Sequence, residues 1–114
     1  MNRDYDLYLE LQKYIDQVDQ ATKELRQHGI AYAEAERDYK ITLRQECLKL
    51  RDDGMAIGMI DKTAYGIPSV AEKRFQRDCA EAVYKANQEA INTLKLRIRV
   101  TDSQISRELS NEKQ

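Results

Sequence analysis

The chain has 114 residues, of which 41% are hydrophobic and 34% are charged, with four glycines, one proline and no tryptophan. So few helix breakers in so charged a chain favour a single domain of long helices over a β-sandwich or a barrel. The 19 basic and 20 acidic residues give a formal net charge of −1, which excludes both a polycation for nucleic acid and an acidic mimic of DNA.

The two cysteines, Cys47 and Cys79, lie far apart in the sequence, form no CxxC pair and are accompanied by one histidine. A zinc site needs about four nearby ligands, so we expect no metal site. Neither a secretion signal nor an apolar run of about 20 residues is visible. We therefore expect free thiols, no membrane insertion and a location in the cytoplasm.

A heptad pattern predicts the first long helix, over about residues 4–53. Apolar side chains recur at steps of three and four residues, which is typical of a coiled-coil seam. The predicted seam residues are Leu7, Leu11, Tyr14, Val18, Ala21, Leu25, His28, Tyr32, Ala35 and Tyr39. For His28, packing in the seam is the simpler interpretation and a pH-sensitive switch is the alternative. Gly29 costs about 1 kcal/mol relative to alanine within a helix, and it predicts a bend or a close crossing.

Gly54 predicts the end of this helix, because glycine readily takes the left-handed conformation of a C-terminal cap. The connector GMAIGMIDKTAYGIP, residues 54–68, holds three of the four glycines and the only proline. It is too apolar for a solvated linker. We therefore expect it to be partly structured and to fold over the end of the helices, with a short helix around residues 61–65.

A second long helix is predicted over about residues 69–109. The segment Ser69-Val70-Ala71-Glu72 follows Pro68 and matches a capping box, in which the serine and the glutamate satisfy amides of the first turn. Apolar positions expected to pack are Phe75, Cys79, Val83, Ala86, Ala90, Ile91, Leu94, Ile98, Thr101 and Ile105. We expect residues 110–114 to fray.

Within this helix the segment LKLRIRV, residues 94–100, alternates apolar and basic residues as a half-buried strand does. The flanking sequences ANQEAIN and TDSQISREL contain neither glycine nor proline to form turns. Moreover, Tyr84, Ile91, Ile98 and Ile105 recur every seven residues straight through the segment. We therefore predict that residues 94–100 are helical.

No residue cluster predicts catalysis, since one histidine leaves few nucleophile–base arrangements and neither a Walker loop nor GxGxxG is present. We expect no catalytic residue, no cofactor and no enzyme activity. The candidate partner-binding residues are Met55, Ile57, Met59 and Tyr65 of the connector, because methionines and an aromatic suit adaptable contacts. The alternative is that they only cover the end of the hairpin.

DNA binding is the alternative function, because residues 50–77 loosely match a helix-turn-helix. The candidate DNA-binding residues are Lys73, Arg74 and Arg77, together with Lys95, Arg97 and Arg99 farther along. The second group also fits a solvated helix face or a basic ridge for a partner. Because the helix predicted over residues 69–109 is long for a compact three-helix module, nucleic-acid binding is not the favoured function.

Two runs, AYAEAERDYKITLRQECLKLRDDGM and AEKRFQRDCAEAVYKANQEAINTLKLRIRVTDSQISRE, resemble a mostly uncharacterised family of short helical phage and prophage proteins of Gram-positive bacteria. The matching elements are Tyr32–Tyr39, Leu48–Met55 and Ala71–Arg99. Ala56 departs from the proline that the family pattern has after its methionine. The resemblance implies an accessory protein in the host cytoplasm, encoded near genes of DNA replication and recombination. It assigns no activity and no site residue.

These patterns predict an all-α protein, a long antiparallel and coiled-coil-like helical hairpin with a partly structured connector. Two helices alone leave each seam half-covered, so we expect a homodimer in the form of a helix bundle. The expected function is non-enzymatic protein–protein interaction. The expected partner is a host or phage protein, for example of the DNA replication or recombination machinery.

Overall fold

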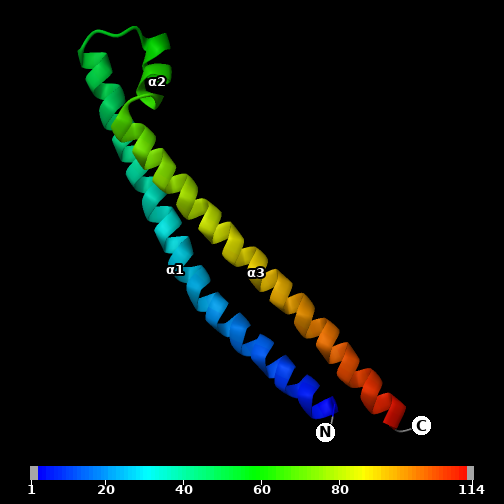
Figure 1. The fold of residues 1–114 in the computed structure, drawn as a ribbon. Coiled ribbons are helices and arrows are strands. Elements are labelled where there is room, and N and C mark those ends of the chain that lie inside the picture. The colour runs from blue at the N-terminus through cyan, green and yellow to red at the C-terminus, as the bar shows by residue number, and fades with distance from the viewer. Residues whose placement is uncertain (1–2, 113–114) are drawn as a thin grey trace. The chain divides into compact units, whose positions relative to one another are not determined.

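The computed structural model describes residues 3–112, and helices make up nearly all of that range. Helix α1 spans Arg3–Asp52, α2 spans Ile57–Tyr65 and α3 spans Pro68–Glu112 (Figure 1). The all-α prediction is confirmed for these residues, and residues 94–100 are helical within α3. Among the described helices, none is both long and apolar enough to cross a membrane.

The chain divides into two compact units, each of which contains a segment of α1 and a segment of α3. Unit 1 consists of Met1–Arg26 and Lys85–Gln114, of which residues 3–26 and 85–112 are described. Unit 2 is the continuous segment Gln27–Tyr84 and includes α2. The contacts that position the candidate site all lie within unit 2.

In unit 1, two polar contacts join α1 to α3. Arg3 lies 3.8 Å from Glu108, and the Asn87 amide donates a hydrogen bond of 3.0 Å to the carbonyl of Ala21. The buried residues are Ala21, Asn87, Ile91, Thr101 and Ile105. Three of the predicted positions on α3, Ile91, Thr101 and Ile105, are therefore confirmed as packed, whereas the buried asparagine was not predicted.

In unit 2, the predicted packing of α3 is confirmed for Tyr84, which lies against Tyr32 and Gly29 of α1, and is wrong for three other positions. Phe75, Cys79 and Val83 are exposed, as are Ala86 and Ala90 at the start of the unit 1 segment. The face toward α1 instead continues the heptad of Tyr84 backwards through Arg77 to Val70. Because Arg77 is charged, the apolar heptad pattern is interrupted at this position and cannot be recognised from hydrophobicity alone. Arg77 can occupy the seam because α1 supplies partners for its guanidinium.

The end of α1 agrees with the prediction. Gly54 has a φ of +89°, which is the left-handed region that glycine enters without strain. The amide of Gly54 donates to the carbonyl of Arg51 at 3.0 Å, and the amide of Met55 donates to the carbonyl of Leu50 at 3.1 Å. This pair of hydrogen bonds is a Schellman motif, and it satisfies carbonyls that the helix end leaves without intrahelical donors.

The ends of the other helices differ from the prediction. Helix α2 is longer than the short helix expected over residues 61–65. Helix α3 begins at Pro68, with the amide of Ala71 donating to the carbonyl of Ile67 at 2.9 Å, so the predicted capping box is wrong. Proline suits the first helical position because an amide there has no intrahelical partner. Ser110–Glu112 belong to α3, so the helix extends three residues beyond the predicted end at about residue 109. The last two residues of the predicted tail, residues 110–114, lie outside the described range.

Gly29 marks a close crossing of α1 and α3. A Cβ atom added there would lie 3.2 Å from Cε1 of Tyr84, which is tighter than most side-chain contacts. We expect Gly29→Leu to lower the free energy of unfolding by about 1–2 kcal/mol, because displacement of the ring outweighs the roughly 1 kcal/mol gained by removing glycine from a helix interior. Ala33→Leu is the control, since Ala33 is exposed one turn later, and should change stability by less than about 0.5 kcal/mol. Equal urea midpoints for the two variants would contradict the close crossing.

Candidate functional site

The four candidate partner-binding residues of the connector do not share one environment. Ile57 is 85% exposed, Met59 54% and Tyr65 44%, whereas Met55 is half-buried. The side chains of α2 that are buried are Ile60 and Ala64. We call Met55, Ile57, Met59 and Tyr65 the connector surface. Helix α2 thus turns one apolar edge inward and leaves other apolar side chains in water.

A groove of about 550 Å³ lies between the last turns of α1 and helix α2. We call it the α1–α2 groove; its lining residues are Lys40, Leu43, Arg44, Cys47, Leu48, Arg51, Ile57, Ile60 and Asp61. The apolar lining side chains come from both helices, and three exposed cations come from α1 alone. The Cys47 thiol donates a weak hydrogen bond to Oδ1 of Asp61 at 3.9 Å. Ile57 belongs to both the groove and the connector surface.

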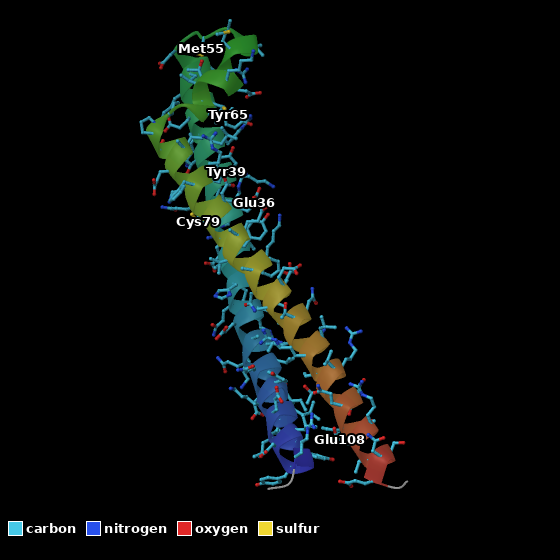
Figure 2. All side chains as sticks on the ribbon, turned by 45° about the vertical axis from the view of Figure 1, so that its right-hand side comes forward. Glu36, Tyr39, Met55, Tyr65, Cys79 and Glu108 are labelled. Atoms are coloured by element: carbon cyan, nitrogen blue, oxygen red, sulfur yellow. The ribbon has the colours of Figure 1, made fainter. Side chains whose placement is uncertain are left out.

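Tyr65 is exposed, but it also makes a contact that stabilises the packing of α2. The guanidinium of Arg74 lies 5.6 Å from the centre of the Tyr65 ring, a cation–π contact between α3 and α2. Burial raises the pKa of the Tyr39 hydroxyl, and the neighbouring Tyr65 raises it further. Figure 2 shows Met55 near the joined ends of α1 and α2, with Tyr65, Tyr39 and then Glu36 farther along the unit. Tyr65 is therefore a poorer probe of partner binding than Ile57 or Met59.

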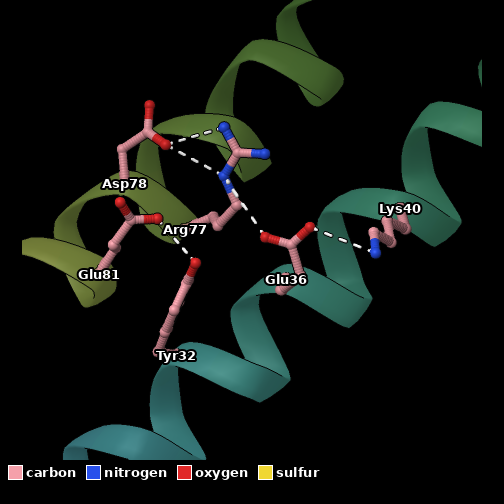
Figure 3. A network of polar contacts seen from close by, with 6 residues as sticks. All are labelled: Tyr32, Glu36, Lys40, Arg77, Asp78 and Glu81. Atoms are coloured by element: carbon pink, nitrogen blue, oxygen red, sulfur yellow. Dashed lines mark hydrogen bonds and ion pairs between the residues drawn. The ribbon is translucent and has the colours of Figure 1, made fainter. Parts of the chain in front are cut away.

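Arg77 is the centre of a polar network between α1 and α3 (Figure 3). Its guanidinium lies 4.4 Å from the centre of the Tyr39 ring, 3.7 Å from Glu36 and 2.9 Å from Asp78. Hydrogen bonding to Asp78 is the main reason that the pKa of Arg77 is raised. The arginine side chain is 23% exposed, so most of its surface is covered by the helices.

A tyrosine–carboxylate pair lies beside Arg77 in this network. The Tyr32 hydroxyl donates to Oε2 of Glu81 at 2.7 Å, and this hydrogen bond raises the pKa of Tyr32. The ring of Tyr32 lies 6.1 Å from that of Tyr84, within the range of tilted aromatic pairs. Glu36 also pairs with Lys40 at 3.5 Å. The network therefore binds α1 to α3 through polar as well as aromatic contacts.

The six basic residues considered for DNA binding lie in different units. In unit 2, Lys73 and Arg74 are half-buried and Arg77 contacts Glu36 and Tyr39. In unit 1, Lys95, Arg97 and Arg99 are exposed, and the Arg97 guanidinium lies 6.0 Å from the centre of the Tyr14 ring. Arg77 hydrogen-bonds Asp78 through Nε and Nη2, which leaves fewer of its donors for a phosphate.

The exposed apolar stripe of α3 forms a second surface, which we call the Phe75 face: Phe75, Cys79 and Val83. These residues are four apart, so they follow one side of the helix. Phe75 is 64% exposed, and Cys79 and Val83 line an apolar hollow of about 220 Å³ with His28, Ala31 and Ala80. The sequence identified this stripe correctly but assigned it to the core, so its role as a surface was missed.

The groove cations were also missed. Lys40, Arg44 and Arg51 follow steps of four and seven residues, which places them along one side of α1. That spacing could have revealed a basic stripe, although it could not have shown that α2 lies beside it. No protein-family model, curated protein or solved structure compared with this chain matches it.

Proposed function

We propose that this chain is a non-enzymatic accessory protein that binds another protein through its connector surface. The observation that carries the proposal is the exposure of Ile57 and Met59, 85% and 54%, on a short helix that also packs through Ile60 and Ala64. Exposed apolar side chains grouped on one element are typical of interaction sites. Methionine adds a flexible side chain that adapts to a partner. The resemblance to phage and prophage proteins suggests a partner in the DNA replication or recombination machinery of the host cell.

Loss of a captured partner on substitution tests this function. We expect Ile57→Ser with Met59→Ser to lose the protein that the tagged wild type captures specifically from an infected host, as identified by mass spectrometry. Because both side chains are exposed, the melting curve should change little. Leu96→Ser with Val100→Ser removes two exposed apolar side chains from unit 1 and is the matched control, which should keep the partner. A folded connector variant that still captures the partner contradicts the proposal.

The proposal includes an antiparallel hairpin that dimerises through the Phe75 face. Supporting the antiparallel order, Tyr32 contacts Glu81, Glu36 contacts Arg77, and Gly29 lies against Tyr84. Supporting dimerisation, a phenylalanine, a cysteine and a valine in one row lie on the surface next to an apolar hollow. A second copy would bury this row in the way that a four-helix bundle buries its inner stripes.

Molar mass in solution tests the dimer. We expect wild-type protein at micromolar concentration to have twice the mass of the chain by light scattering. Val83→Glu should halve that mass without loss of helical circular dichroism, because it places a charge in an apolar interface. Ala82→Glu is the matched control, since Ala82 is exposed and not part of the Phe75 face. A monomeric wild type, or a Val83→Glu variant that stays dimeric, contradicts this interface.

A further inference from the structure

We infer that the α1–α2 groove binds an amphipathic helix of a partner protein that carries acidic residues beside its apolar stripe. This inference rests on the proposed function and specifies the chemistry of the partner. Its basis is the combination of apolar side chains from two helices with cations from one of them. A groove of this construction suits helix-in-groove recognition, in which apolar residues about one turn apart insert as anchors.

The apolar part of the groove sets the shape of the ligand. Its volume of about 550 Å³ is ample for several inserted side chains. Leu43 and Cys47 are half-buried and Ile60 is buried, so they present a packed apolar wall. Ile57 continues this wall onto the connector surface, so one helix can contact both. Because a duplex nucleic acid presents phosphates rather than apolar side chains to a groove, this lining favours a peptide.

The charged residues of the groove favour a ligand of negative charge. Lys40, Arg44 and Arg51 are three cations among the lining residues, against one carboxylate, Asp61. Lys40 already has Glu36 as a partner at 3.5 Å, so Arg44 and Arg51 supply most of the charge available to a ligand. The whole chain has a net charge of −1, so this cationic edge is a local feature. Charges at the edge of an interface favour partners of opposite sign and reject those of like sign.

Binding of defined peptides to the full chain tests the inference. The probe is a fluorescent synthetic helix with leucines at i, i+4, i+7 and i+11 flanked by glutamates, and the comparison peptide has lysines in place of the glutamates. By fluorescence anisotropy at low salt, the glutamate peptide should bind about tenfold more tightly than the lysine peptide. A glutamate peptide of the same composition with scrambled leucines should bind at least as weakly as the lysine peptide, because it lacks an apolar stripe.

Charge reversal identifies the binding edge. Arg44→Glu with Arg51→Glu should weaken binding of the glutamate peptide about tenfold and strengthen binding of the lysine peptide. Lys23→Glu with Arg26→Glu is the matched control, because it makes the same charge change at exposed positions of α1 outside the groove. The control should bind both peptides as the wild type does. Circular dichroism of each variant shows that the helices are retained.

The two cysteines locate the peptide. Cys47 lines the α1–α2 groove, whereas Cys79 lies on the Phe75 face. We expect the glutamate peptide to slow alkylation of Cys47 by iodoacetamide and to leave the alkylation rate of Cys79 unchanged, as followed by mass spectrometry. Dimerisation through the Phe75 face would slow Cys79 with or without peptide, so it does not imitate the expected result.

Several outcomes would overturn the inference. The first is equal affinity of the chain for the two charged peptides, and the second is protection of Cys79 instead of Cys47. The third is displacement of the bound glutamate peptide by a short DNA duplex as effectively as by unlabelled glutamate peptide. Protection of Cys47 that rises with protein concentration without peptide would identify a second copy as the occupant instead. If the variant with Arg44 and Arg51 reversed keeps the partner that the Ile57 and Met59 variant loses, the groove inference fails while the proposed function stands.

Discussion

Val70→Asp is expected to lower the free energy of unfolding by about 3–5 kcal/mol. Val70 is 0% exposed, and it lies in the first turn of α3. A charged aspartate there would lose its hydration. Burial would instead raise the pKa of the carboxyl group and favour its protonation, and either outcome destabilises the folded state at neutral pH. Urea unfolding followed by circular dichroism measures the change.

The neighbouring residue provides the control for this substitution. Ser69 lies in the same turn of α3 but is exposed. An aspartate at Ser69 should stabilise the protein by about 0.3–1 kcal/mol, because a negative charge interacts favourably with the amino end of a helix. If an aspartate lowers the free energy of unfolding at position 70 and raises it at position 69, burial of Val70 is the cause of the lost stability. Similar urea midpoints for the two variants would show that the start of α3 is not packed.

Arg77→Ala is expected to lower the free energy of unfolding by about 2 kcal/mol. The substitution removes the cation–π contact with Tyr39 and the packing of the arginine stem, and it leaves Glu36 without this cation. Arg77→Lys should recover only part of the loss, because an ammonium group keeps the charge but lacks the planar donors of a guanidinium. Thermal unfolding of the three proteins measures both effects.

Arg37 is a matched control for Arg77. Both arginines hydrogen-bond the aspartate that follows them, Asp38 and Asp78, through Nε and a terminal nitrogen. The Arg37 side chain is 63% exposed, however, so Arg37→Ala should change stability by less than about 0.5 kcal/mol. If the two alanine variants lost the same stability, the contribution of Arg77 would come from its neighbouring aspartate and not from the contacts with α1.

The packed faces of α1 and α3 show how much of the helix packing the heptad periodicity predicts. In α1 the predicted positions are packed: Ala21 and Tyr39 are buried, and Leu11, Val18 and Tyr32 are half-buried. In α3 two apolar stripes compete, one through Phe75 and Val83 and one through Val70 and Tyr84. Hydrophobicity favours the first stripe because the second contains Arg77. The contacts favour the second, because Glu36 and Tyr39 compensate for burying that arginine.

The candidate site was predictable to a smaller extent. The apolar connector was identifiable because Ile57, Met59 and Ile60 are unusual in a solvated loop. Which of these side chains is exposed depends on the rotation of α2 against its neighbours, and Ile60 is buried while Met59 is not. The groove requires α2 to lie beside Arg44 and Arg51 of α1. No sequence pattern within α1 or within α2 predicts that the two helices are neighbours there.

By itself, the sequence determined the helical class, the seam of α1 and the cap at Gly54, because each depends on residues within a few turns of one another. Only the tertiary structure decided that Arg77 occupies the seam, that the Phe75 face is exposed and that a cationic groove forms beside α2. These outcomes depend on pairs such as Tyr32 and Glu81, which are 49 residues apart in the chain. Local periodicity specifies which sides of a helix can pack, and the contacts available on its neighbour select the side that does.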